Sequence, residues 1–190
     1  MMKLSVKNMV CPRCITAVEK VLAELDLAPV NVQLGEAETG VNPSESQFVT
    51  LKQKLQEAGF ELLEDNKLQL VDKIKSVIIN HIHHSENTPV VFSELIANTL
   101  HRDYSGLSKL FSATEGITIE QFIILQKIEK VKELLQYNEN TLSEIANTMG
   151  YSSVAHLSAQ FRKSTGLTPT AFRQTGAALR RPLDTVSGKV

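Results

Sequence analysis

The residues of this chain best suited to chemistry are two cysteines three positions apart, Cys11 and Cys14. Pro12 suits the first position of a helix, which would place both sulfurs beside unpaired backbone N–H groups at the positive helix end, with Arg13 adjacent. These neighbours favour the thiolate form, and two thiolates at this spacing can hold one soft cation such as Cu(I). Structural zinc normally takes four ligands, so the pair falls short of a zinc site unless histidines or a second chain contribute.

Two other interpretations of the cysteine pair stay open. The segment Cys11-Pro12-Arg13-Cys14 also resembles a redox dithiol, which would make it a thiol–disulfide sensor. A domain that only packs or dimerises is the third interpretation. His81, His83 and His84 are candidates for extra metal ligands, but we favour imidazoles that complement the negative end of a helix.

The elements around the cysteines alternate between strand and helix periods. Alternating apolar residues predict strands over residues 3–7, 30–34 and 36–41, with a turn at Gly35. Apolar residues at three- and four-residue spacing predict helices over residues 15–25 and 46–58, the second capped by Ser46. With a last strand at residues 60–62, the order is βαββαβ, an α+β domain of the ferredoxin-like class that spans residues 1–66.

On such a fold, the segment Asn8-Met9-Val10-Cys11-Pro12-Arg13-Cys14 resembles the heavy-metal-associated domain of copper chaperones and transporter N-termini. The segment Ala58-Gly59-Phe60 falls at the loop that faces the metal site in that family. The resemblance implies that Cys11 and Cys14 are the metal ligands, that Met9 is a buried support, and that a metal chaperone is a partner. Asn8 stands where the family usually has glycine.

Beyond residue 66 the chain is predicted to be helical. Residues 67–89 form a connecting helix, carrying residues 68–84, and a polar linker that ends at Pro89. The apolar stripe of Val71, Ile74 and Ile78 favours packing on a neighbouring domain over pairing of two chains. Residues 90–174 are predicted to form an all-α domain, and residues 175–190 a loose tail.

Within the all-α domain, the segment after residue 140 predicts two short helices joined by a sharp turn. Thr141 or Ser143 can cap the first helix, and Glu144 completes a capping box with Thr141. Gly150 can take the positive φ of a tight turn, and a second helix begins at residue 152 or 153. This is the pattern of a helix-turn-helix, whose second helix enters the major groove of DNA.

A second copy of the pattern lies upstream, at residues 92–111. Ala97 falls where Ala146 does, and Asp103 caps the second helix. The place of Gly150 is taken by His101, which puts the tightness of that turn in question. A long helix over residues 118–137 joins the copies and would hold them apart, so one chain could supply a double helix-turn-helix.

The helical part closely resembles the AraC/XylS-type DNA-binding domain over residues 90–174. The residues that carry this resemblance are Leu142-Ser143-Glu144-Ile145-Ala146, Gly150-Tyr151, His156-Leu157-Ser158-Ala159-Gln160-Phe161-Arg162-Lys163, Thr165-Gly166-Leu167-Thr168-Pro169 and Phe172-Arg173. The resemblance implies a transcriptional regulator, often an activator, with double-stranded DNA and RNA polymerase as partners.

Carried over by position, the base-facing residues of the first copy are Ser105, Ser108 and Lys109. Those of the second copy are Ala155, His156 and Ala159. An alanine can only meet a thymine methyl, whereas Lys109 and His156 keep donors for base edges. Contacts to the DNA backbone are expected from Arg162, Lys163 and Arg173, so binding should weaken steeply with salt. A packing module that has lost DNA binding is the alternative.

Composition agrees with a globular protein and excludes several classes. The net charge is −1, which is the sum of −2 for residues 1–84 and +1 for residues 85–190. Charge alone therefore does not indicate nucleic-acid binding. We expect no membrane span, no secretory signal and a cytoplasmic location. We expect no enzyme, because no phosphate loop or catalytic constellation is present and Cys11 and His156 belong to separate domains.

These predictions combine into one hypothesis. A cation, or an oxidant, at Cys11 and Cys14 would reorder the first helix, the helix over residues 68–84 would relay the change, and the DNA domain would respond. A homodimer is compatible with this hypothesis.

Overall fold

The computed structural model describes residues 2–85, 90–175, 182–184 and 186. The chain forms two compact units. The first is Met1–Asn80 with Thr99–His101, and the second is His81–Asn98 with Arg102–Val190. The first unit combines a sheet with helices, whereas the described part of the second is helical.

The first unit contains an antiparallel sheet and helices in the predicted order. Strand β1 (Met2–Lys7), helix α1 (Pro12–Glu24) and strands β2 (Pro29–Gln33) and β3 (Glu36–Thr39) are followed by α2 (Glu45–Glu57) and β4 (Glu61–Leu63). The strands lie in the order β2-β3-β1-β4. In the register, Leu4 lies opposite Ala37, and Val6 lies opposite Leu62. The βαββαβ order expected from the sequence is therefore present.

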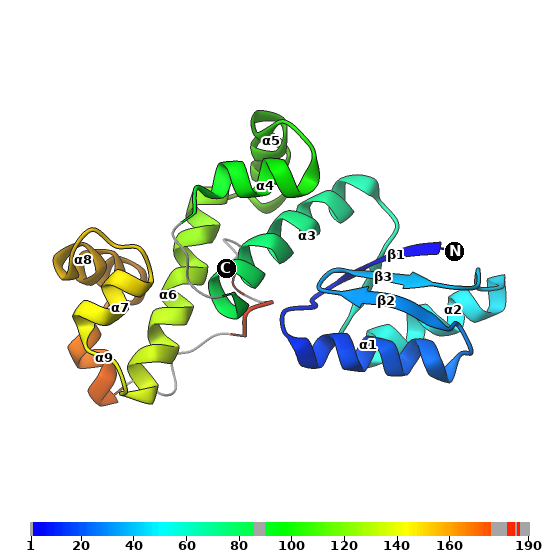
Figure 1. Ribbon diagram of the computed structural model, residues 1–190, viewed down its shortest axis with the longest axis horizontal. Helices are drawn as coiled ribbons and strands as arrows, with labels where there is room; N and C mark the ends of the chain where they lie inside the picture. Colours follow the sequence, from blue (N-terminus) through cyan, green and yellow to red (C-terminus); the bar gives the residue numbers. More distant parts are fainter. Residues whose placement is uncertain (1, 86–89, 176–181, 185, 187–190) are drawn as a thin grey trace. The chain divides into compact units, whose positions relative to one another are not determined.

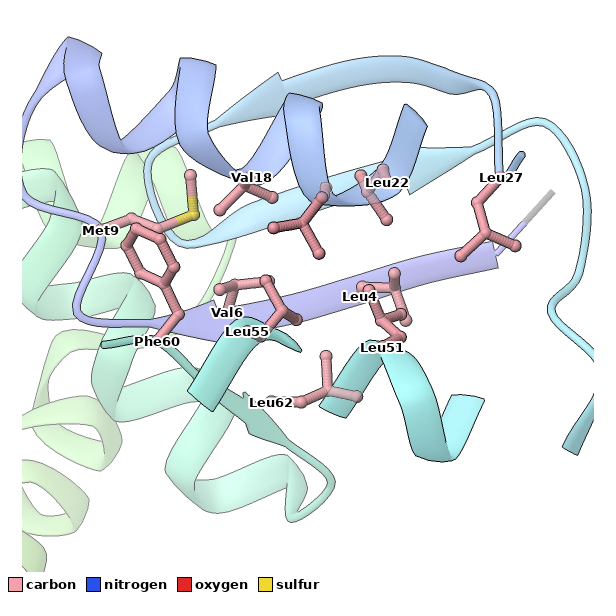
Figure 2. Close-up of a cluster of buried hydrophobic side chains, with 12 residues drawn as sticks. Leu4, Val6, Met9, Val18, Leu22, Leu27, Leu51, Leu55, Phe60 and Leu62 are labelled. Carbon is pink, nitrogen blue, oxygen red and sulfur yellow. The ribbon is translucent and has the colours of Figure 1, made fainter. Parts of the chain in front are cut away.

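The core of this unit lies between the sheet and the pair α1 and α2 (Figure 1). Figure 2 shows Leu4 and Val6 of β1 pointing toward Val18 and Leu22 of α1. Leu55 of α2 belongs to the same core cluster. These side chains are at most 3% exposed. Burying each one contributes about 1.5–3 kcal/mol to folding, so this layer fixes the position of α1 and of the cysteines at its start.

The cap of α2 differs from the prediction. Ser44, not Ser46, precedes the helix, and its hydroxyl accepts a hydrogen bond from the Gln47 backbone at 3.3 Å. The Gln47 side chain completes the capping box and also donates to the Leu25 carbonyl at 3.1 Å. That contact with the end of α1 ties the start of α2 to its neighbour, which local spacing could not show.

The predicted connecting helix is part of the first unit. Helix α3 (Asn66–Ile79) contacts β1 and β4, and Gln69 donates to the Leu63 carbonyl at 2.7 Å. Lys73 forms an ion pair with Glu36, which alternates with the core residue Ala37, so α3 covers the opposite face of the sheet. The α-helix ends at Ile79, and residues Asn80–His84 continue as a π-helix.

The second unit is helical, as predicted. It contains most of α4 (Phe92–Leu100), then α5 (Tyr104–Glu115), α6 (Ile119–Tyr137), α7 (Leu142–Thr148), α8 (Val154–Thr165) and α9 (Pro169–Thr175). Helix α6 joins the α4–α5 pair to the group of α7, α8 and α9 (Figure 1). Thr118 caps α6 in a capping box, as Thr141 does for α7. The long joining helix of the sequence prediction is confirmed.

The predicted loose tail is wrong for part of its length. The Leu183 carbonyl accepts a hydrogen bond from Gln126 at 3.3 Å, and Val186 is 3% exposed. Residues 176–181, 185 and 187–190 lie outside the described residues. In the described part of the chain, no helix combines the length and hydrophobicity needed to cross a membrane.

Candidate nucleic-acid interface and thiol site

Helices α5 and α8 are built on the same template, fifty positions apart. Asp103 caps α5 by accepting from the Gly106 N–H at 3.0 Å, and Ser153 caps α8 by accepting from the His156 N–H at 3.1 Å. Both helices end on a glycine in the left-handed region, with φ of +75° at Gly116 and +78° at Gly166. The two candidate recognition helices therefore begin and end alike.

The interiors of the two copies repeat as well. The rings of Phe111 and Phe122 meet edge to face with centroids 5.6 Å apart, and those of Phe161 and Phe172 do so at 5.4 Å. All four rings are at most 1% exposed. Each pair joins a recognition helix to the helix that follows the glycine, so both copies are locked by one kind of contact.

The turn of the first copy is as tight as that of the second. Gly150 has φ of +69°, and the next backbone N–H, of Tyr151, donates to the Ala146 carbonyl at 2.8 Å. His101 has φ of +51°, and the next N–H, of Arg102, donates to the Ala97 carbonyl at 3.2 Å. The histidine adopts the conformation that glycine adopts more easily, so the helix-turn-helix geometry survives the replacement.

Most of the predicted base-facing side chains lie on the surface. Ser105 and Lys109 of α5 are exposed, and Ser108 is half-buried; Ala155, His156 and Ala159 of α8 are all exposed. The His156 ring is oriented by its Nδ1, 3.1 Å from the Ser152 hydroxyl, and by an edge contact with the Tyr151 ring. The outward face of each helix is thus free to meet a ligand.

The candidate backbone contacts divide into two kinds. Arg162 and Lys163 are exposed in the last turn of α8. Arg173 is half-buried, and its Nη2 donates to the Asn140 carbonyl at 2.8 Å, so this arginine braces the loop before α7. Sequence reasoning missed Arg102, which is exposed at the first turn; its position directly after His101, the glycine-equivalent residue, was the available signal.

Sequence reasoning also missed Lys127, in the middle of α6. Its Nζ donates to the Met149 carbonyl at 2.8 Å and lies 5.6 Å from the centre of the Tyr151 ring. Burial lowers the pKa of this lysine. The sequence offered no clear signal for this lysine, because Gln126, Glu129 and Lys130 around it are also polar or charged.

The two cysteines meet at the start of α1, as predicted. Cys11 is the N-cap residue, with extended backbone, and Pro12 is the first helical residue. The two sulfurs are 3.4 Å apart, and both residues are half-buried. At metal–sulfur bonds of about 2.3 Å, sulfurs at this separation can both reach one ion.

The expected ease of forming a thiolate is wrong for Cys14. Burial raises the pKa of the Cys14 thiol, the neighbouring Cys11 sulfur adds to the rise, and a hydrogen bond with the Val10 backbone opposes it. The helix end and Arg13, which is exposed, do not outweigh the loss of water around this sulfur. A cation that replaces the proton would therefore be the partner that stabilises the thiolate.

The predicted burial of Met9 is confirmed, and Asn8 adopts the backbone conformation of the glycine whose place it takes. Met9 is 2% exposed and lies beside Phe60 in the core (Figure 2). Asn8 has φ of +73°, the conformation that favours glycine, and its side-chain amide donates to the Gly59 carbonyl at 3.1 Å. The loop Ala58–Phe60 is thereby tied to the segment that leads to Cys11.

The three histidines of the π-helical stretch make packing contacts. The His83 ring lies 3.1 Å from the Gln126 side-chain oxygen, and burial lowers its pKa to about 4. The His81 ring meets the Phe92 ring edge to face at 5.3 Å. Among residues that the structure describes, no three His, Cys, Asp or Glu side chains gather as metal ligands.

Comparisons with known proteins agree with the helical part. Residues 96–175 match the family model described as "Helix-turn-helix domain". The "Probable transcriptional regulator LumQ" of Photobacterium leiognathi is 27% identical over 104 residues, which cover 54% of this chain and 42% of LumQ. The "HTH-type transcriptional activator RhaR" of Cronobacter sakazakii is 34% identical over 73 residues, which cover 38% of this chain and 26% of RhaR.

The chain thus spans less than half the length of these two curated relatives. Among solved structures, the C-terminal domain of AraT, a response regulator from Geobacillus stearothermophilus, is 27% identical with a TM-score of 0.47, covering 56% of this chain and 84% of that chain. Residues 96–175 of this chain therefore match a helix-turn-helix domain, and curated transcriptional regulators are among the proteins to which the chain is similar.

Proposed function

We propose that this protein is a cytoplasmic, sequence-specific DNA-binding transcriptional regulator that inserts α5 and α8 into consecutive major grooves of one duplex. The observation that carries the proposal is the repetition of one helix-turn-helix geometry on α6, with matching caps, turns and ring pairs. Dimeric regulators place such units one helical turn of DNA apart. Here one chain supplies both.

The exposed faces of α5 and α8 support a DNA reader over a packing module. A packing helix buries apolar side chains, whereas these faces present Lys109, His156, Arg162 and Lys163 to solvent. In this proposal Lys109 and His156 would donate to base edges, and the cations at the end of α8 would bind phosphates. An activator that contacts RNA polymerase is the form of regulation suggested by the resemblance.

A selection experiment tests DNA binding. The whole chain is incubated with a library of random DNA duplexes, and retained sequences are determined. We expect a motif with two half-sites about 10 base pairs apart. A double variant, Lys109→Ala with His156→Ala, should lose the motif, while Lys20→Ala in α1 should keep it. Retention of no preferred sequence would contradict the proposal.

For the first unit, we propose that Cys11 and Cys14 bind one soft cation such as Cu(I). The two thiols lie within reach of one ion, and two thiolates are fewer than the four ligands that structural zinc needs, so their number favours a soft cation. The buried Met9 and the hydrogen-bonded Asn8 would hold the loop in place around the ion. The resemblance to heavy-metal-associated domains adds a metal chaperone as the donor of the ion.

A thiol–disulfide sensor is the second candidate, because the same 3.4 Å separation also brings the two thiols close enough to react. Thiol–disulfide exchange with an oxidised small-molecule disulfide would form the Cys11–Cys14 bond and release two small thiols, and the reverse exchange with reduced thiols would restore the two cysteines. Metal binding or disulfide formation would change DNA binding only if it favoured one conformation of the protein over another.

Titration under reducing conditions separates the candidates. The purified whole chain is titrated with Cu(I), Ag(I) and Zn(II) against a competing chelator. We expect one equivalent of Cu(I) or Ag(I) to bind tightly, Cys11→Ser and Cys14→Ser to abolish binding, and Thr16→Ser on the same helix to leave it intact. Absence of stoichiometric binding would end the metal proposal, and a disulfide that forms at cytoplasmic redox potentials would favour the sensor of oxidants.

A further inference from the structure

We propose that Lys127 is a positioning residue that holds the two helix-turn-helix copies at one fixed separation and thereby sets the spacing of the DNA half-sites that the protein accepts. Only the measurement of DNA binding described below rests on the proposed function. The geometric part concerns the second unit alone and can be tested without DNA.

On one side, Lys127 is bound to the turn of the second copy. Its ammonium donates to the Met149 carbonyl at 2.8 Å, and Met149 is the C-cap residue of α7. Carbonyls at the end of a helix carry partial negative charge, so they attract a cation. The ammonium also lies 5.6 Å from the centre of the Tyr151 ring, within the range of a cation–π contact.

On the other side, the same ammonium faces the start of the first copy. Its Nζ is 6.0 Å from the centre of the Phe92 ring, and Phe92 is the first residue of α4. One side chain of α6 thus lies against both copies. Other lysines of α6 pair within the helix, Lys130 with Glu133 and Lys132 with Glu129.

Partial burial makes this arrangement specific. A cation withdrawn from water is costly unless it is bound, and burial lowers the pKa of Lys127 for that reason. The Tyr151 hydroxyl is buried without a hydrogen-bond partner in the described part of the chain. The tyrosine is therefore held by its ring and not by its hydroxyl, which makes the ring the relevant partner of the lysine.

The test uses four variants of the whole chain. Lys127→Met keeps the apolar stem but removes the charge and the donor. Lys127→Gln is a second, polar variant in case the first one folds poorly, and Lys127→Arg keeps the charge. Tyr151→Phe is the matched control, because it removes only a hydroxyl that has no partner among the described residues.

The first readout is the distance distribution between spin labels on α5 and α8, measured by double electron–electron resonance. Labels are placed at the exposed positions Ala113 and Ser164, in proteins in which Cys11 and Cys14 are replaced by serine. We expect a single narrow distribution for the parent protein, Lys127→Arg and Tyr151→Phe. Lys127→Met and Lys127→Gln should broaden or split it; unchanged widths in both would overturn the proposal.

The second readout is binding to the selected DNA motif with inserts between its half-sites. An insert of about 5 base pairs turns one half-site to the opposite face of the duplex. The parent protein should lose about tenfold or more in affinity, whereas Lys127→Met should lose about threefold, since a looser joint lets either copy adjust. The same loss in both proteins would overturn the proposal. If no DNA is bound at all, the proposed function fails while the distance measurement still decides the role of Lys127.

Discussion

The two helix-turn-helix copies share their interiors and differ on their surfaces. Leu107 and Phe111 of α5 correspond to Leu157 and Phe161 of α8, and all four are at most 2% exposed. On the outside, Lys109 corresponds to Ala159, whereas Ala113 corresponds to Lys163. Close packing restricts which residue types fit a buried position. At an exposed position the residue type depends instead on what the surface binds. Under the proposed function, the two copies would therefore read different DNA sequences from the same scaffold.

The turns and caps differ in a second way. The first copy uses His101 at a positive φ and a charged cap, Asp103, and the second uses Gly150 and the neutral cap Ser153. The second turn is also the one to which Lys127 is hydrogen-bonded. The geometry is the same, but the residues that produce it are not.

The largest expected effect concerns the shared interior. Phe111→Ala and Phe161→Ala should each destabilise the second unit by about 3–5 kcal/mol, because each removes a fully buried ring and leaves a cavity. Urea unfolding followed by circular dichroism measures the loss. Similar losses of unfolding free energy would support equivalent packing in the two copies. A loss in only one variant would show that the two cores do not contribute equally to stability.

The next effect concerns the exposed cations. Lys109→Ala should cost about 1–3 kcal/mol of DNA affinity and relax the preference at one base pair, as expected for a base contact. Lys163→Ala should weaken binding to all sequences and reduce the salt slope by about 1, as expected for a phosphate contact. Binding isotherms at several salt concentrations distinguish the two. Identical behaviour of the variants would remove the division of roles.

The turns give a smaller effect of opposite sign in the two copies. Gly150→Ala should destabilise the protein by about 1–2 kcal/mol, because a side chain at a φ of +69° is strained. His101→Gly should relieve the same strain and stabilise the protein by up to about 1 kcal/mol, since the greater freedom of glycine in the unfolded chain offsets part of the gain. Midpoints of urea unfolding measure both changes. Two changes of the same sign would be inconsistent with equivalent turns.

The smallest effect concerns the caps. Asp103→Ser gives α5 the cap of α8, so stability should change by only a few tenths of a kcal/mol. DNA binding should strengthen slightly, because one negative charge near the phosphates is removed. The reciprocal change, Ser153→Asp, should weaken it. A fluorescence anisotropy titration with the selected duplex is sufficient, and a weaker complex with Asp103→Ser would contradict the expected placement of α5 against DNA.

Much of the helical unit could be predicted because its signals are local. The capping boxes at Thr118 and Thr141 depend on residues three positions apart, and Gly150 is indicated by the positive φ that its own position in the turn requires. The element order of the first unit follows likewise from strand and helix periods. The start of α2 was misplaced although a local signal was present: Ser44 and Gln47 have the spacing of a capping box, whereas Ser46 has Val49 at that position.

The candidate sites were only partly predictable. Cys11 and Cys14 are neighbours in sequence, so their meeting required no tertiary information, but the raised pKa of Cys14 comes from burial under the fold. Arg173 was expected to contact the DNA backbone, and the structure adds a hydrogen bond from its Nη2 to the carbonyl of Asn140, thirty-three positions away. Surface roles of single cations depend on which partner the fold brings within reach.

Local patterns in the amino-acid sequence were enough to establish the order of helices and strands, the repeat of the helix-turn-helix and the position of the thiol pair, because propensities, caps and apolar periods act over a few residues. Two features required the folded chain: α3 covers the second face of the sheet, and Lys127 lies between Phe92 and Tyr151. Each of these depends on groups that are distant along the chain. The contacts that stabilise these features form only in the folded chain.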